Sequence, residues 1–269
     1  MINNKKILSI ITARAGSKGI PNKNIKELMG KPLFEWSVLA SLNSKYIDKT
    51  VISSDSREIE LIYIDRVKKD QKWENVAFIK RPKKISGDLS INEEALIHAY
   101  NQMKMIFNSE YSIILNLQPT SPVRLNSLID RCLEEYSSGG YNSLLTASVH
   151  TPFFWQKRNG KWEYINRYFE VAYVKREWQP KETYQLVPAF DDCCNRKMRQ
   201  QFLEEEMMWH DDGNIYIVDT EVLLSKKCRI GSNPCVFPVE KLNSLQIDTE
   251  FDFKLIENMI KSYNIEKLY

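Results

Sequence analysis

A short apolar run, Ile7–Ile11, changes within a few residues into a loop rich in glycine and cationic side chains, Ala13–Asn24. The run has the length and composition of a buried strand. Open α/β sheets bind ligands at the carboxyl ends of such strands, because backbone N–H groups can approach phosphate there. The pattern therefore predicts an anionic ligand, with a nucleotide as the first candidate. By itself the loop favours phosphate only modestly, since glycine also permits an ordinary tight turn and lysine solvates one.

The first half of the chain alternates between apolar runs and segments with helical spacing. Further strand-like runs lie at Thr50–Ser54, Asn75–Ile79 and Tyr111–Leu117. This alternation predicts an α/β fold with a mostly parallel sheet flanked by helices. The loop after the first run matches neither G-x-x-x-x-G-K-[ST] nor G-x-G-x-x-G, so neither a P-loop nor a dinucleotide fingerprint is present. The polar residues expected at the carboxyl edge of the sheet are Arg14, Asp55, Arg81 and Gln118.

Three helix starts are predicted from capping patterns. Asp55 follows a strand-like run and precedes a charged helical stretch. Ser90 and Glu93 have the spacing of a capping box, and so do Thr249 and Asp252.

The composition changes near residue 150, where aromatic residues become frequent. Asn159-Gly160 separates two β-like runs and predicts a hairpin. The segment Tyr168–Gln201 shows no helical period, and an irregular segment of this length in a compact domain usually serves a site or a partner. We interpret residues 150–205 as a β-rich dimerisation arm inserted into a single domain that spans residues 1–269. The alternative is a surface flap folded back on a monomer.

The charge and cysteine content narrow the classes of partner. The chain has 269 residues, and its 38 basic and 35 acidic side chains are interspersed, which argues against a nucleic acid polymer as partner. Five cysteines form no C-x-x-C pair, and three scattered histidines disfavour a zinc site. Because there is also no apolar run long enough for a secretion signal or a membrane span, we expect a cytoplasmic protein with reduced thiols and no membrane partner.

The polar residues favour phosphoryl or nucleotidyl transfer. No Ser–His–Asp or Cys–His set can be assembled. Cationic loops with a few carboxylates suit a reaction in which positioning and charge neutralisation by Lys, Arg and Mg²⁺ dominate. Such a reaction needs a metal-binding carboxylate, and Asp248, at the end of an apolar segment, is the best candidate. Helix capping by Thr249 and Asp252 also explains this local sequence, and from spacing alone it is the preferred interpretation.

Six segments, in this order over nearly the whole chain, resemble motifs of the acylneuraminate cytidylyltransferases, the CMP-sialic acid synthetases. They are Ala13–Asn24, Gly30–Pro32, Leu117–Arg124, Asn195–Gln200, Asp212–Ile217 and Ile247–Glu250. The resemblance implies a Rossmann-like nucleotidyltransferase fold with a dimerisation arm exchanged in a homodimer. It also implies Mg²⁺-dependent transfer of CMP from CTP to the anomeric hydroxyl of an acidic nine-carbon sugar, a nonulosonic acid, with release of pyrophosphate.

The same resemblance implies roles for individual residues. Those expected to bind the nucleotide are Arg14, Ser17, Lys18, Lys23 and Asn24 in the triphosphate loop, and Arg81 near the base. Those expected to bind the sugar are Gln118, Arg199 and Tyr216, with Arg199 pairing with the sugar carboxylate from its own or the neighbouring subunit. Asp248 corresponds to a metal-binding aspartate, and Arg14, Lys23 and Asp248 are the expected catalytic residues.

One position departs from the family pattern. Many members have Asp-x-Asp where this chain has Gln246-Ile-Asp248, and a glutamine amide brings no charge to a metal. The residues therefore leave open whether Gln246 replaces a second metal ligand and which nonulosonic acid is the acceptor. The alternatives are another sugar nucleotidyltransferase, with a different nucleotide or sugar, and a non-catalytic nucleotide-binding regulator.

Overall fold

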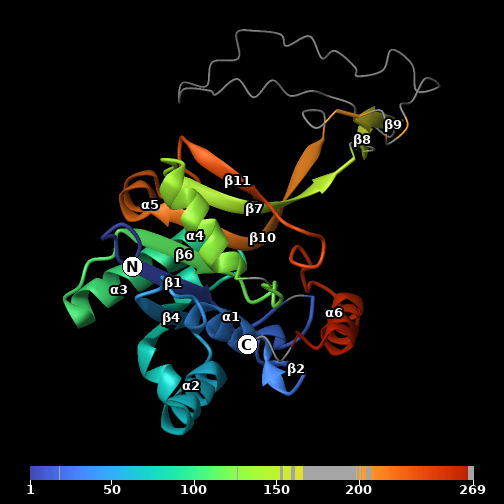
Figure 1. Cartoon of the computed structure of the whole chain (residues 1–269). Coiled ribbons are helices and arrows are strands. Elements are labelled where there is room, and N and C mark those ends of the chain that lie inside the picture. The colour runs from blue at the N-terminus through green and yellow to red at the C-terminus, as the bar shows by residue number, and fades with distance from the viewer. Residues whose placement is uncertain are drawn as a thin grey trace. The chain divides into compact units, whose positions relative to one another are not determined.

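The computed structural model describes residues 1–17, 19–125, 127–151, 154–158, 161–165, 198, 200, 202–203 and 207–265. These residues form two compact units (Figure 1). The first unit comprises Met1–Ser148 and Asp211–Tyr269, and the second comprises Val149–His210.

A seven-stranded sheet forms the centre of the first unit, in the order β11-β7-β10-β6-β1-β4-β5. Its strands are β1 (Ile7–Thr12), β4 (Lys49–Ser54), β5 (Val76–Lys80), β6 (Ile113–Leu117), β7 (Ser143–His150), β10 (Met208–Asp219) and β11 (Pro234–Pro238). Strands β6, β1, β4 and β5 run parallel, as do β7 and β11, whereas β10 runs antiparallel to β6. The predicted mostly parallel α/β sheet is confirmed.

Helices cover both faces of this sheet, which explains why the parallel strands are apolar without alternation. On one face, Ile7 and Ile11 of β1 pack in a buried cluster with residues of α1 (Leu33–Leu42), α2 (Arg57–Lys69) and α4 (Leu128–Ser138). On the other face, Leu8 and Ile10 pack with residues of α3 (Asn92–Phe107) and α5 (Thr220–Lys226). Short 3-10 helices lie at Lys23–Ile25, Gln71–Asn75 and Lys83–Ile85.

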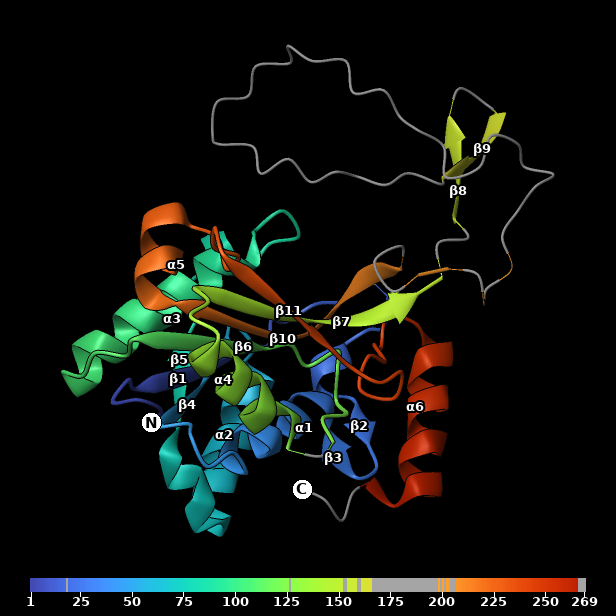
Figure 2. The ribbon, with the colours of Figure 1, turned by 45° about the horizontal axis from the view of Figure 1, so that its top comes forward.

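A third apolar cluster holds the last helix, α6 (Glu250–Tyr263), against the first half of the chain. Phe253 and Ile256 of α6 pack there with Trp36 of α1 and with Leu28 of the small hairpin formed by β2 (Glu27–Leu28) and β3 (Lys31–Pro32). Figure 2 shows α6 beside this hairpin. The Trp36 indole N–H donates to the Leu28 carbonyl at 3.1 Å. This packing brings the segment before α6 to the loop after β1.

The helix starts differ in part from the capping predictions. Ser56, not Asp55, caps α2 by accepting from the Ile59 N–H, because the Asp55 carboxylate accepts from the Ala15 N–H at 2.8 Å. The predicted cap at Ser90 is wrong, since α3 begins at Asn92 without a side-chain cap. The capping box that opens α6 is present, with Thr249 and Asp252 bonding each other's backbone N–H groups.

The described part of the second unit contains an antiparallel hairpin. Its strands are β8 (Phe154–Arg158) and β9 (Lys161–Ile165), and Arg158 pairs with Lys161. The hairpin predicted around Asn159-Gly160 is therefore confirmed. Residues 166–197 lie outside the described residues, so the dimerisation arm stays a prediction. Among the described residues, no helix combines the length and the apolarity needed to span a membrane.

Candidate active site

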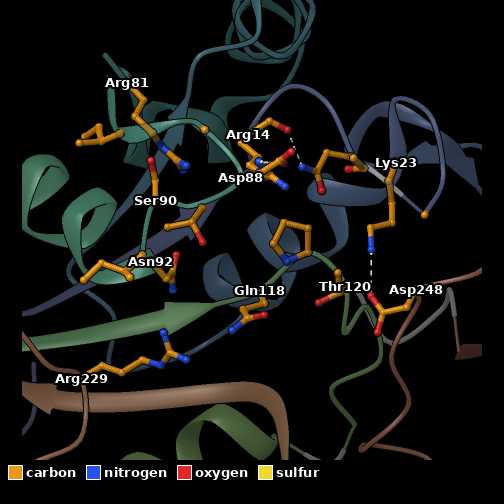
Figure 3. A pocket seen from close by; sticks show the side chains of 18 residues that line it. Arg14, Lys23, Arg81, Asp88, Ser90, Asn92, Gln118, Thr120, Arg229 and Asp248 are labelled. Carbon is orange, nitrogen blue, oxygen red and sulfur yellow. Dashed lines mark hydrogen bonds and ion pairs between the residues drawn. The ribbon is translucent and has the colours of Figure 1, made fainter. Parts of the chain in front are cut away.

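A cavity of about 580 Å³ lies at the carboxyl edge of the parallel strands. Its walls come from the loops that follow β1, β5 and β6, which meet there because the strands are parallel neighbours. Two residues from the last third of the chain, Arg229 and Asp248, complete the wall (Figure 3).

The structure brings most of the expected site residues together in this cavity. Those that line it are Arg14, Ser17, Lys23, Asn24, Arg81, Gln118 and Asp248. Lys18 and Arg199 lie outside the described residues. The roles of all these residues stay predictions, but their convergence gives a pocket with three cations at one edge of the sheet.

Lys23 and Asp248 tie the loop after β1 to the segment before α6. The Lys23 ammonium donates to the Ile247 carbonyl at 2.7 Å and to Asp248 Oδ1 at 3.1 Å. The lysine side chain is 11% exposed and the aspartate side chain 67%, so the carboxylate keeps a free face toward the cavity. A Cβ on Gly19 would lie 2.2 Å from the Asp248 carbonyl oxygen, so only glycine permits this approach of two backbones.

Arg14 connects the loop after β1 to the loop after β5. Its guanidinium pairs with Asp88 at 2.8 Å, and its carbonyl accepts from the Asn24 side-chain amide at 2.9 Å. Asp88 thus brings a second carboxylate to the cavity, and the sequence did not predict it because no motif in the loop after β5 extends beyond Arg81.

Arg81 is a fixed cation at the wall of the cavity. Its Nη2 donates to the Ser53 carbonyl at 2.6 Å and its Nε to the Ser53 hydroxyl at 3.1 Å. Burial lowers the pKa of Arg81 to about 10, which still leaves it charged at neutral pH. A buried, hydrogen-bonded arginine provides donors in a constant geometry.

The donor set at Asp248 fits Mg²⁺ that takes its other ligands from phosphate and water. Mg²⁺ in nucleotide sites is held by one or two carboxylates together with substrate phosphates. The described residues contain no cluster of three or more His, Cys, Asp or Glu that could hold a metal without such help. Gln246 does not line the cavity, because its side-chain amide donates to the Asp212 carbonyl.

Tyr216 lies one layer below the cavity wall and is not among the residues that line it. Its hydroxyl donates to the Asp211 carboxylate, whose oxygens lie at 2.8 and 2.9 Å, and its ring lies 4.3 Å beneath the Arg229 guanidinium. Burial and the neighbouring Asp211 raise the pKa of Tyr216, so the hydroxyl stays protonated. Arg229, which does line the cavity, was not found from the sequence.

A model of the cytidylyltransferase family matches residues 8–185. The chain is 26% identical to the post-translational flagellin modification protein B of Campylobacter coli, over 97% of both chains. It is 26% identical to the N-acylneuraminate cytidylyltransferase of Escherichia coli, over 98% of this chain and 54% of the relative. It is 26% identical to the CMP-N,N'-diacetyllegionaminic acid synthase of Legionella pneumophila, over 95% of this chain and 97% of the relative.

The fold is also similar to solved structures. A CMP:2-keto-3-deoxy-manno-octonic acid synthetase complexed with CTP superposes with a TM-score of 0.58 and 13% identity, covering 96% of this chain and 99% of that one. At this identity the likeness concerns the fold.

Proposed function

This chain belongs to the cytidylyltransferase family, and we propose that it transfers CMP from CTP to the anomeric hydroxyl of a nonulosonic acid, releasing pyrophosphate. The observation that carries the proposal is the single cavity wall on which Arg14, Lys23 and Arg81 meet the exposed Asp248 carboxylate. Relatives named as N-acylneuraminate cytidylyltransferase and CMP-legionaminic acid synthase support the acceptor class.

On the nucleotide side, the side chains around the cavity bind and neutralise the triphosphate. Arg14 and Lys23 donate to phosphate oxygens, and Arg81 presents fixed donors near the nucleoside. The anomeric oxygen attacks the α-phosphorus in line, and the loop cations stabilise the charge that accumulates on the leaving pyrophosphate. Asp248 is the residue that would hold Mg²⁺, which when bound supplies further charge neutralisation at the phosphates.

On the sugar side, Gln118 presents its amide to the acceptor from the end of β6. Arg199 is proposed to pair with the sugar carboxylate, a planar anion suited to two parallel hydrogen bonds from a guanidinium. Tyr216 supports this side from beneath rather than by lining the cavity. A homodimer and a cytoplasmic location, where CTP is supplied, complete the proposal.

The test is a panel of the four nucleoside triphosphates against sialic, legionaminic and pseudaminic acids, scored by pyrophosphate release with and without Mg²⁺. Release that requires CTP, Mg²⁺ and one of these acids is the expected result. Turnover of another nucleotide or of a sugar 1-phosphate would instead identify another sugar nucleotidyltransferase. Tight CTP binding without turnover would identify a regulator, an outcome motivated by the uncharged Gln246.

A further inference from the structure

Arg229 is a cation in the cavity wall that the nucleotide and metal roles leave unused. It follows α5 and precedes β11, and its side chain is 21% exposed. Figure 3 places it on the side of the cavity that carries Asn92 and Gln118, away from Arg81 and from the Lys23–Asp248 pair. Its position therefore belongs to the acceptor side rather than to the triphosphate side.

The guanidinium of Arg229 is held in place before any ligand binds. Its Nη1 lies 3.2 Å from Glu93 Oε1, and its plane rests on the Tyr216 ring at 4.3 Å. The Tyr216 hydroxyl is in turn fixed by Asp211. Stacking on an aromatic face together with an ion pair orients an arginine more strictly than either contact alone.

The hydrogen-bonding capacity of Arg229 is only partly used within the described residues. Arg81 bonds Ser53 through two of its nitrogens, whereas Arg229 has one carboxylate partner, and its buried Nε has no hydrogen-bond partner there. A guanidinium carries five N–H donors, so Arg229 has donors left for a ligand in the cavity.

The charge around Arg229 indicates what kind of ligand group it takes. Glu93 lies against the guanidinium and Asp211 lies beneath the tyrosine, so the cation is already compensated by carboxylates. The opposite side of the cavity, with Arg14, Lys23 and Arg81, carries the excess of positive charge. An anion bound at Arg229 would also be repelled by Glu93, and this repulsion is strong in a partly buried site, whereas a neutral oxygen gains the hydrogen bond without it.

We propose that Arg229 is a specificity-determining residue that donates a hydrogen bond to a neutral oxygen of the acceptor sugar, the carbonyl of an acylamino substituent. This inference rests on the proposed function and deepens it, because it names a residue in the cavity wall of this chain that recognises the acyl group. A site built to hydrogen-bond one substrate group discriminates against the analogue that lacks it, since its donor is then left unpaired.

The test compares two acceptors, an N-acylated nonulosonic acid and its analogue with a hydroxyl in place of the acylamino group, in wild type and in Arg229→Met. We expect the variant to lower kcat/KM for the acylated sugar by about 10- to 100-fold and to bring the two acceptors within about 3-fold of each other. The Kd for CTP should stay within about 2-fold of the wild-type value, because the nucleotide lies on the other side. Arg131→Met is the matched control, since Arg131 also stacks on an aromatic ring, that of Phe237, but does not line the cavity.

Unchanged preference between the two acceptors in Arg229→Met would overturn the proposal, and so would a parallel loss of CTP affinity. Calorimetric Kd values for both sugars in the presence of a non-reacting CTP analogue give the same comparison without turnover. Wild-type protein that binds the acylated sugar but releases no pyrophosphate would therefore contradict the proposed function while still testing Arg229. Arg229→Lys keeps the charge and a donor, and it should recover part of the preference.

Discussion

The contact between Lys23 and Asp248 combines a largely buried cation with a carboxylate that faces the cavity. The lysine is fixed by the Ile247 carbonyl, so it does not depend on Asp248 for its position. If Asp248 holds a divalent cation as proposed, it would give up this ion pair while the Ile247 carbonyl keeps the lysine in place.

Asp248→Asn should lower Mg²⁺-dependent turnover by about 100-fold or more, because the change removes the one charged ligand proposed for the metal. CTP binding in EDTA should not weaken, because the change removes an anion from the cavity and leaves Lys23 free of its ion pair. Glu250→Gln is the control, since Glu250 pairs with Lys26 and does not line the cavity. Comparing initial rates of pyrophosphate release over a Mg²⁺ titration checks this, and equal losses in both variants would contradict the metal role.

Asp88 is an anion in a cavity proposed for an anionic ligand, and it pairs with Arg14 at 2.8 Å. Asp88→Asn should tighten metal-free CTP binding by about 2- to 5-fold, the size expected for an exposed ion pair. Fluorescence or calorimetric titration with CTP in EDTA measures the effect, and added salt should reduce it. Weaker binding in the variant would show that Asp88 serves the ligand rather than competing with it.

At the scale of the elements, the close approach of the loop after β1 to the segment before α6 depends on Gly19. Gly19→Ala would place its Cβ 2.2 Å from a backbone oxygen, so one of the two segments has to move. We expect a loss of turnover of about 10- to 100-fold, since displacements of about 1 Å in a site have this effect. Gly87→Ala is the control, because Gly87 also lines the cavity but its Cβ would meet only the Ser90 hydroxyl at 3.8 Å. Circular dichroism checks that both variants fold, and steady-state kinetics should show the loss of turnover in Gly19→Ala but not in Gly87→Ala.

Asp212 in β10 should make the free energy of unfolding depend on pH. Its Oδ1 accepts from the Thr146 hydroxyl at 2.6 Å, its Oδ2 is buried without a partner among the described residues, and burial raises its pKa above 3.8. The folded state then keeps the proton to a higher pH than the unfolded state. The free energy of unfolding therefore falls as the pH rises from about 3.8 through the raised pKa.

Asp212→Asn does not titrate, so its stability relative to wild type should increase with pH over that window. Urea unfolding at several pH values from 4 upward, taken as roughly one-unit steps, measures the difference. Asp65→Asn should show no increase over this window, because the hydrogen bond from Lys69 lowers the pKa of Asp65, and its stabilising contribution is lost only as the pH falls below about 3.8. If the difference in free energy of unfolding between Asp212→Asn and wild type did not change with pH, the raised pKa of Asp212 would be contradicted.

Much of this arrangement could be predicted from local sequence, and the exceptions have physical reasons. The apolar run of β1 identified a strand buried on both faces, and the parallel order then placed Arg14, Arg81 and Gln118 at one edge. Asp55 follows its strand as a capping residue would, but the backbone N–H of Ala15, 40 residues earlier in the sequence, donates to its carboxylate instead. Arg229 stacks on Tyr216 of β10, which runs antiparallel to β6. Because Arg229 does not follow the carboxyl end of a parallel strand, the strand pattern did not predict it.

At the scale of the whole molecule, we predict that the protein forms a homodimer through its second unit. Leu203 and Trp209, which belong to it, are 60% and 43% exposed in the single chain, and the proposed partner subunit would cover such residues if they lie in the interface. The protein should elute as a dimer at micromolar concentration. A clean monomer would count against a sugar site completed across subunits.

Arg199→Ala tests the same assembly through the chemistry. It should raise the KM for the sugar far more than the KM for CTP, because it removes the proposed partner of the sugar carboxylate. If Arg199 acts across subunits, mixing Arg199→Ala with an Asp248→Asn chain should restore part of the activity in heterodimers. Equal effects of Arg199→Ala on both KM values would contradict the proposal that Arg199 pairs with the sugar carboxylate.

The Lys23–Asp248 contact joins residues 225 positions apart, so the loop after β1 meets this carboxylate only after the segment before α6 has been made. A chain still growing on the ribosome can form β1, the loop and the first helices while this corner of the cavity is missing, because domains fold as their segments emerge. Chains that stop before this segment would thus lack the Lys23–Asp248 corner of the cavity, and the proposed site would be completed only when that segment emerges.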